Sequence, residues 1–213
     1  GPNSIQLSSG RNINAAHILI ATGAWPSVPE IPGAGHGITS NEVFSLPQLP
    51  KRAVIAGGGY IANEFAGIFN ELGVDVKLVT HGDRILRGYD EEIVDKLVDL
   101  SRQKGIDIRF HFGIQSVTKQ DDGTLLIEGN NGETIETDLL LWAIGRTPHT
   151  IGLGLEAVGV DLGKDGSVQV GDDNRTNIPS IYAVGDVTNR VQLTPIAIRE
   201  GHAFADSVFG NNP

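Results

Sequence analysis

The sequence predicts an α/β fold in which a βαβ unit carries a β-meander and is flanked on both sides by shorter α/β segments. From Arg52 onward, short apolar runs alternate with a helical pattern, which is typical of parallel βαβ units. Gly123 and Asn130-Asn131-Gly132 mark turns between short alternating segments, which is typical of a meander. Composition shifts near residues 50 and 150. We therefore expect three segments, over residues 1–46, 47–149 and 150–213.

The composition excludes several classes of function. With 213 residues the chain can bury a sizeable core, and its net charge of -10 argues against binding to a phosphate backbone. No apolar run approaches the roughly 20 residues of a membrane helix. The first residues show no basic region followed by an apolar stretch, so we expect no secretory signal there. The chain has no cysteine, so it holds no disulfide or thiolate metal site of its own. We expect a cytoplasmic protein that binds no nucleic acid, membrane or metal.

The first segment contains one clear strand followed by a connector. Residues 16–23 form a short apolar run that ends in Thr22 and Gly23, as a buried strand does when it stops at a tight turn. Prolines and glycines punctuate residues 24–50, so we expect only short structure there.

The second segment begins with a βαβ unit. Residues 53–56 predict a strand, residues 60–72 a helix and residues 76–79 a second strand. Gly73 is suited to end this helix, and a second helix is expected over residues 90–104. The apolar positions expected to face the core are Ile61, Phe65, Ile68, Phe69 and Leu72 in the first helix, and Ile93, Leu97 and Leu100 in the second.

Further strands complete the pattern. Residues 106–112 predict a third strand, the meander follows, and residues 139–145 predict an apolar strand that ends at a glycine. The last segment has Gly-rich loops, a strand over residues 180–184 and a helical tail.

The turn after the first strand of the βαβ unit matches the dinucleotide fingerprint of a Rossmann-like domain. Gly57 permits the tight turn, Gly59 lets the backbone approach a pyrophosphate, and Ala62 keeps the helix close to the strand. Tyr60 and Ile61 open the helix, whose free N–H groups then face the phosphates. The alternative is a tight strand–helix turn without a ligand, which the full βαβ context disfavours.

The end of the second strand bears on which dinucleotide binds. NAD sites commonly place a carboxylate there, but this chain has Thr80. His81, Arg84 and Arg87 follow and could pair with a 2′-phosphate, since an Arg fork suits phosphate geometry. Asp83 argues against a bound 2′-phosphate unless it is a turn residue. The basic residues could also belong to a solvated loop that binds no ligand.

Three runs closely resemble glutathione reductases, which are FAD-dependent pyridine nucleotide-disulfide oxidoreductases. The first covers residues 57–67, Gly-Gly-Gly-Tyr-Ile-Ala-Asn-Glu-Phe-Ala-Gly, and the second covers residues 141–146, Leu-Trp-Ala-Ile-Gly-Arg. The third, Ile-Tyr-Ala-Val-Gly-Asp at residues 181–186, is followed by Leu193-Thr194-Pro195. With the Ala21-Thr22-Gly23 turn, the resemblance extends over nearly the whole chain.

The resemblance implies roles around the nicotinamide for four residues. Tyr60 would lie over the flavin and gate the entry of nicotinamide, and Glu64 would frame the pocket. Ile144 and Gly145 would line the nucleotide channel. From the sequence alone, Tyr60 could equally be a half-buried packing residue and Glu64 an exposed surface carboxylate.

The resemblance also implies flavin contacts in the flanking segments. Asp186 would accept hydrogen bonds from the ribityl chain, Thr194 would touch the ring edge through its backbone, and Thr22 and Gly23 would belong to the same site. For Asp186 the alternative is a helix or turn cap.

Departures from the family's pattern limit these inferences. His81 stands at the first of two arginine positions in the phosphate cluster, Arg87 is preserved, and Arg84 occupies a lysine-like place. The family's N-terminal glycine loop, cysteine pair and C-terminal interface domain have no counterpart in this sequence. We therefore expect a fragment that is inactive alone and binds little or no flavin.

The leading interpretation is the NADP(H)-binding portion of a glutathione-disulfide reductase. The parent enzyme would pass a hydride from NADPH to FAD and then electrons to glutathione disulfide, acting as a homodimer. One alternative is an NADH-linked flavoprotein similar to dihydrolipoamide dehydrogenase. The other is a non-catalytic nucleotide-binding module.

Overall fold

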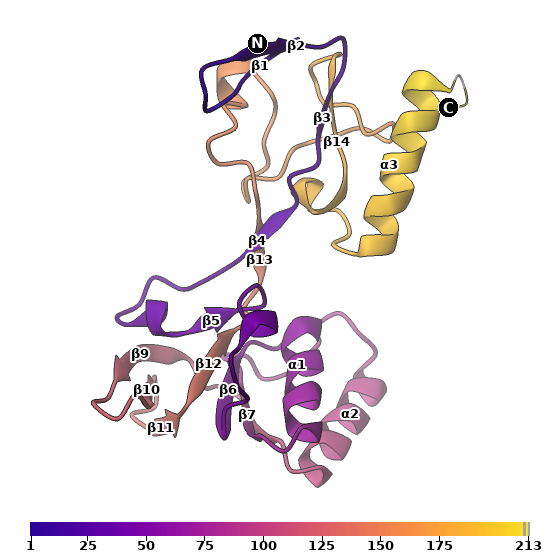
Figure 1. Ribbon diagram of the computed structural model, residues 1–213. Coiled ribbons are helices and arrows are strands. Elements are labelled where there is room, and N and C mark those ends of the chain that lie inside the picture. Colours follow the sequence, from indigo (N-terminus) through magenta and orange to yellow (C-terminus); the bar gives the residue numbers. More distant parts are fainter. Residues whose placement is uncertain (211, 213) are drawn as a thin grey trace. The chain divides into compact units, whose positions relative to one another are not determined.

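The computed structural model describes residues 1–210 and 212, and the chain divides into two units (Figure 1). The central unit is Pro26–Gly145, and the flanking unit combines Gly1–Trp25 with the described residues from Arg146 onward. The sequence had suggested divisions after residues 46 and 149. Residues 26–46 group with the central unit because they pack on it: the Nε1 of Trp142 donates to the carbonyl of Ala34 at 2.9 Å.

The central unit is built on one parallel sheet. Its five strands lie in the order β5 (Ile38–Thr39), β12 (Leu139–Trp142), β6 (Arg52–Ala56), β7 (Asp75–Val79) and β8 (Asp107–Arg109). The three middle strands are almost entirely buried, which explains their near-continuous apolar sequence. The predicted α/β fold is confirmed. The strand expected over residues 106–112 is shorter because the backbone turns at His111, whose φ is 56°.

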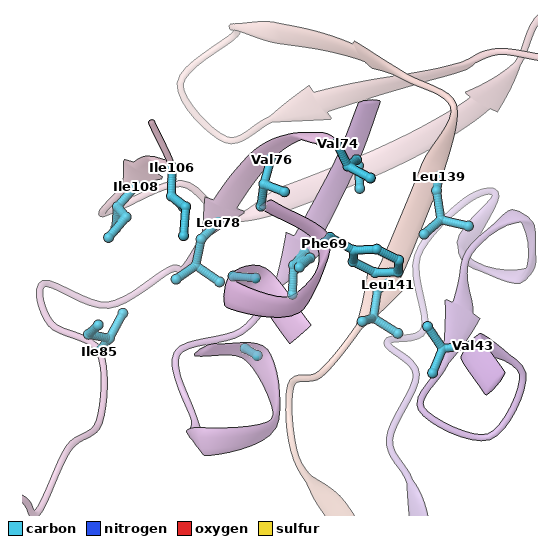
Figure 2. Packing of buried hydrophobic residues seen from close by; sticks show 14 of the residues in the cluster. Val43, Phe69, Val74, Val76, Leu78, Ile85, Ile106, Ile108, Leu139 and Leu141 are labelled. Carbon is cyan, nitrogen blue, oxygen red and sulfur yellow. The ribbon is translucent and has the colours of Figure 1, made fainter. Parts of the chain in front are cut away.

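Two helices cover one face of this sheet. α1 (Tyr60–Glu71) links β6 to β7, and α2 (Glu91–Gln103) links β7 to β8. Phe69 of α1 packs with Leu78 and Leu141 of the sheet, and Ile85 joins the same cluster from the loop after β7 (Figure 2).

The predicted apolar faces of both helices were partly wrong. In α1 the buried residues are Ala62, Ala66 and Phe69, because small side chains let the helix lie close to the sheet. Ile68 and Leu72 are exposed. In α2 the buried residues are Val94 and Val98, whereas Ile93 is 70% exposed and Leu100 is 45% exposed.

The expected meander covers the other face of the sheet. It consists of β9 (Ile114–Lys119), β10 (Leu125–Gly129) and β11 (Thr134–Thr137), paired in sequence order and antiparallel. Ile127 of β10 shares a buried cluster with Leu140 and Trp142 of β12. The central unit therefore has three layers: helices, parallel sheet and meander. Its connector adds two short 3₁₀ helices, Ala34–His36 and Val43–Ser45.

The flanking unit has three sheets of two strands each. β1 (Ser4–Gln6) pairs with β2 (Asn12–Asn14), β3 (Ile18–Ile20) runs parallel to β14 (Ile181–Ala183), and β4 (Ala24–Pro26) pairs with β13 (Arg146–Pro148). Two 3₁₀ helices follow, Glu156–Val158 and Gly185–Thr188, and then α3 (Thr194–Phe209). One small core packs around Ile20, Val168 and Ile181, and Phe204 of α3 packs on Tyr182.

Candidate nucleotide-binding site

The glycine turn between β6 and α1 has the geometry that the sequence predicted. Gly57 has a φ of 135°, and an added Cβ would lie 2.1 Å from the carbonyl oxygen of Ala143, so no larger residue fits. Gly59 is the N-cap of α1 in an extended conformation, and no atom lies within 4 Å of a Cβ added there. The turn is closed on the side of β12 and open at Gly59.

The N-terminus of α1 faces this open space without a side-chain cap. Ala62 is fully buried, which brings the first turn of the helix close to the sheet, and Ile61 is half-buried beside it. The Nδ2 of Asn63 donates to the carbonyl of Gly59 at 2.8 Å and so braces the turn. An uncapped helix N-terminus behind a glycine turn suits an anionic ligand.

The loop after β7, residues 80–89, packs directly on the glycine turn. The amide of Leu86 donates to the carbonyl of Gly58 at 2.6 Å, and Ile85 beside it is fully buried in the core. Thr80 is buried, and its Oγ1 accepts from the amide of Gly82 at 3.3 Å. Thr80 therefore shapes the start of the loop in the place where an NAD site would present a carboxylate.

These two segments enclose a pocket of about 290 Å³. It is lined by Gly58, Gly59, Tyr60, Thr80, His81, Arg84, Leu86, Arg87 and Tyr89. The pocket thus brings together the glycine turn, Tyr60 and the three predicted basic residues. Sequence reasoning missed Leu86 and Tyr89. Leu86 has a φ of 48°, a conformation that nothing in a leucine side chain signals.

The basic residues of the pocket differ in their partners. The guanidinium of Arg84 donates to Glu91 at 2.9 Å and to Asp95 at 2.8 Å. The bond to Glu91, aided by the charge of Asp95, raises the pKa of Arg84 above its usual value. Arg87 is more exposed, and its NH2 contacts Asp83 at 3.3 Å. A backbone hydrogen bond lowers the pKa of the Asp83 carboxyl, and the hydrogen bond from the Arg87 side chain lowers it further.

The remaining candidates of the central unit lie near the turn but do not line the pocket. Glu64 is exposed, one turn of α1 beyond Tyr60. Ile144 and Gly145 follow β12, next to the Ala143 carbonyl that closes on Gly57. The carboxyl ends of β6 and β12 meet at this edge, since Ala143 donates to the carbonyl of Ala56 at 2.8 Å.

The flanking unit holds the other candidates. The Oγ1 of Thr22 donates to the carbonyl of His149 at 2.7 Å, and Gly23 turns the chain with a φ of 71°. Asp186 follows β14 and lies 3.8 Å from the Nε of Arg146, and Thr194 opens α3.

Sequence reasoning missed the groups that hold the Asp186 turn. The carboxylate of Glu200 accepts from the amide of Gly185 at 2.7 Å and from Arg190 at 2.8 Å.

Among the residues that the structure describes, no helix is long and apolar enough to cross a membrane. Within the same residues, no group of three His, Cys, Asp or Glu could hold a metal ion.

A glycine turn at the carboxyl edge of a parallel sheet, open toward an uncapped helix, is typical of dinucleotide-binding α/β proteins. Comparison with known proteins identifies the family. The model of the pyridine nucleotide-disulphide oxidoreductase family matches residues 2–201. The chain belongs to this family, as the sequence resemblance indicated.

Two curated relatives and one solved structure illustrate the similarity. A glutathione reductase of Burkholderia cepacia is 50% identical over 210 residues, covering 99% of this chain and 46% of the relative. A trypanothione reductase of Trypanosoma congolense is 43% identical over 204 residues, covering 94% and 42%. The HOCl-induced flavoprotein disulfide reductase RclA of Escherichia coli superposes with a TM-score of 0.92 at 28% identity, covering 99% and 49%.

The chain therefore spans about half the length of the curated relatives that it matches. Glutathione reductases use FAD and NADPH.

Proposed function

We propose that this chain is the NADP(H)-binding portion of a glutathione-disulfide reductase. The proposal rests on the pocket in which the open glycine turn meets a basic loop. At the start of this loop the chain has Thr80 where an NAD site would have a carboxylate. The similarity to glutathione reductases over nearly the whole chain supports it.

The residues of the pocket fit an NADP(H) dinucleotide. The space beside Gly59 admits a pyrophosphate, which the first N–H groups of α1 would bind. His81 and Arg87 would bind the 2′-phosphate, since both line the pocket and Arg87 carries a forked donor group. Tyr60 would shield the flavin until nicotinamide enters, with Glu64 framing the pocket. Ile144 and Gly145 would line the channel for the nucleotide.

The flanking unit would contribute to a flavin site. FAD, when bound, supplies the redox chemistry that carries electrons from nicotinamide to a disulfide. Asp186, half-buried beside Arg146, would accept hydrogen bonds from the ribityl hydroxyls. The backbone at Thr194 and the turn at Thr22 and Gly23 would contact the same cofactor.

The remaining parts of the proposal concern the whole enzyme. Its substrate would be glutathione disulfide, its assembly a homodimer and its location the cytoplasm. The 213-residue chain has no cysteine to accept electrons, so we expect it to reduce no glutathione disulfide and to bind little flavin by itself.

Titration calorimetry of the chain with NADPH and NADH tests the nucleotide assignment. We expect tighter binding of NADPH. Arg87→Ala should weaken NADPH by about one to two powers of ten, because a charge-assisted hydrogen bond contributes roughly 1.5 to 3 kcal/mol. NADH lacks the 2′-phosphate and should be almost unaffected.

Arg11→Ala is the matched control, because it removes the same charge from the flanking unit. Equal losses for both nucleotides in Arg87→Ala, or a native preference for NADH, would contradict the assignment and favour the NADH-linked alternative.

A further inference from the structure

Arg84 lines the nucleotide pocket, but its guanidinium is held by two carboxylates of α2. NH1 contacts Glu91 at 2.9 Å and NH2 contacts Asp95 at 2.8 Å. Glu91 and Asp95 are four residues apart in α2, so both side chains project from the same face. The Arg84 side chain is 30% exposed. Both arms of the Arg84 fork are therefore engaged within the protein.

The backbone at Arg84 is part of the wall of the glycine turn. A Cβ added to Gly58 would lie 3.5 Å from the carbonyl oxygen of Arg84 and 3.4 Å from the Cα of Ile85. Ile85 is fully buried, and Leu86 donates to Gly58 at 2.6 Å. A shift of residues 84–86 would consequently change the glycine turn and the position of Arg87 together.

Arg87 differs from Arg84 in the exposure of its side chain and in the number and length of its acidic contacts. Its side chain is 64% exposed, and its acidic contact, to Asp83, is longer, at 3.3 Å. Asp83 belongs to the same loop and not to a separate helix. A phosphate can displace such a contact at little cost, because exposed ion pairs contribute at most about 1 kcal/mol.

We propose that Arg84 is a positioning residue, which fixes the loop of residues 80–89 to α2 through Glu91 and Asp95 and does not itself bind the 2′-phosphate. This inference rests on the proposed function, since it assumes a nucleotide in this pocket. It gives Glu91 and Asp95 of α2 a role in supporting the binding site, although neither of them lines the pocket.

Removing one carboxylate partner of Arg84 distinguishes a phosphate-binding role from a positioning role, because the two roles predict opposite changes in the affinity for NADPH. If Arg84 bound the phosphate, Glu91 and Asp95 would compete with the ligand, and removing either carboxylate would tighten NADPH. If Arg84 positions the loop, removing either carboxylate loosens the loop and weakens binding. The loss should be similar for NADPH and NADH, because the displaced segment also contacts the glycine turn.

The experiment is titration calorimetry of the chain with NADPH and with NADH, using Asp95→Asn, Arg84→Gln and the double variant. We expect Asp95→Asn, which breaks one exposed ion pair, to weaken both nucleotides by roughly two- to fivefold, and Arg84→Gln, which breaks both, by roughly three- to tenfold. The double variant should lose no more than Arg84→Gln alone, since both changes break one interaction. Thermal unfolding of every variant excludes loss of the folded state as the cause.

Two matched controls also remove one negative charge. Glu92→Gln removes a carboxylate from the same turn of α2 without removing either partner of Arg84, and binding should hardly change. Asp83→Asn frees Arg87 and should tighten NADPH by about two- to fivefold, with NADH unaffected.

Tighter NADPH binding in Asp95→Asn, or a loss in Arg84→Gln confined to NADPH, would overturn the positioning role. So would additive losses in the double variant. These outcomes are independent of the proposed function, which fails if native NADH binds more tightly or if Arg87→Ala affects both nucleotides equally.

Discussion

The two units of the chain differ in how completely their sheets are covered. The central unit has a five-stranded parallel sheet with helices on one face and a meander on the other. The sheets of the flanking unit have two strands each, and Phe204 is the buried residue among the sixteen of α3. Two-stranded sheets are marginal alone. The unit that carries the candidate nucleotide pocket thus also carries the larger buried core.

The units also differ in the distance along the chain between paired strands. In the central unit β6 pairs with β7 across one helix, and β7 pairs with β8 across the next. In the flanking unit β3 pairs with β14 from the other end of the chain. Closing such a long loop is entropically costly, so we expect the β3–β14 pair to open more readily than the strand pairs of the central sheet.

The largest change in stability that tests this comparison is expected from a substitution that leaves a cavity in the central core. Leu141 of β12 is fully buried (Figure 2), and Leu141→Ala should destabilise the central unit by about 2 to 5 kcal/mol. Ile198→Ala in α3, at a half-exposed position, is the control and should cost almost nothing. Hydrogen exchange measured strand by strand is the readout.

We expect Leu141→Ala to speed exchange in β6, β7 and β12. It should leave the exchange of β3 and β14 nearly unchanged, because we expect these amides to exchange through opening of the flanking unit itself. Equal acceleration in both units would mean that they unfold as one cooperative body, and the comparison would fail.

The fold of the central unit could be predicted because its signals are local. The strand, turn and helix around Gly57 each follow from residues close in sequence. The buried faces of the helices could not be predicted in full, because they depend on how closely a helix approaches the sheet. Ala62 and Ala66 permit a close approach, which leaves Ile68 in solvent. The apolar pattern of the helix allowed either face.

The glycine turn provides a second test, which separates stability from binding. Gly57→Ala places a Cβ 2.1 Å from a backbone carbonyl at a φ of 135°, and should cost about 3 kcal/mol of stability or more. Gly59→Ala meets no atom within 4 Å and should fold normally.

Because the Gly59 Cβ would occupy the space for the pyrophosphate, we expect Gly59→Ala to weaken both nucleotides by about tenfold or more, at about 1.4 kcal/mol per tenfold. Thermal unfolding and calorimetry on both variants check this. Unchanged binding in Gly59→Ala would show that the nucleotide does not lie over the turn.

The sequence singles out candidate residues of the site but not the contacts between them. Gly57, Thr80 and Arg87 stand out from the sequence through spacing alone. The link from Arg84 to Asp95 joins a loop to a helix whose rotation the sequence does not specify. In the flanking unit, likewise, the contact between Arg146 and Asp186 joins residues far apart in sequence.

The smallest expected change in stability concerns one carboxylate in each unit. The carboxylate in the central unit has a charged hydrogen-bond partner, and the one in the flanking unit has neutral partners. Asp138 accepts from Arg52 in the central unit at 2.7 Å, and this bond lowers the pKa of its carboxyl. In the flanking unit, hydrogen bonds from Ser167 and Asn189 lower the pKa of Asp165 to about 2.

A lowered pKa means that the folded state binds the proton less readily than the unfolded state. The stability that each carboxylate contributes is therefore complete above its unfolded pKa of about 3.9 and is lost as pH falls through the folded value. At pH 7 Asp138→Asn should destabilise the central unit by about 1 kcal/mol, discounted for partial exposure.

The two units should respond differently to salt in this experiment. Raising the salt to about 1 M shortens the screening length to about 3 Å, so it should reduce the effect of Asp138→Asn on β6 and β12. The effect of Asp165→Asn on its own unit should persist, because its partners are uncharged. Hydrogen exchange of the native chain and both variants, measured at pH 7 and pH 3 and at low and high salt, shows how the stability of each unit depends on pH and on salt. Equal sensitivity to salt at both positions would refute the distinction between a charged and a neutral partner.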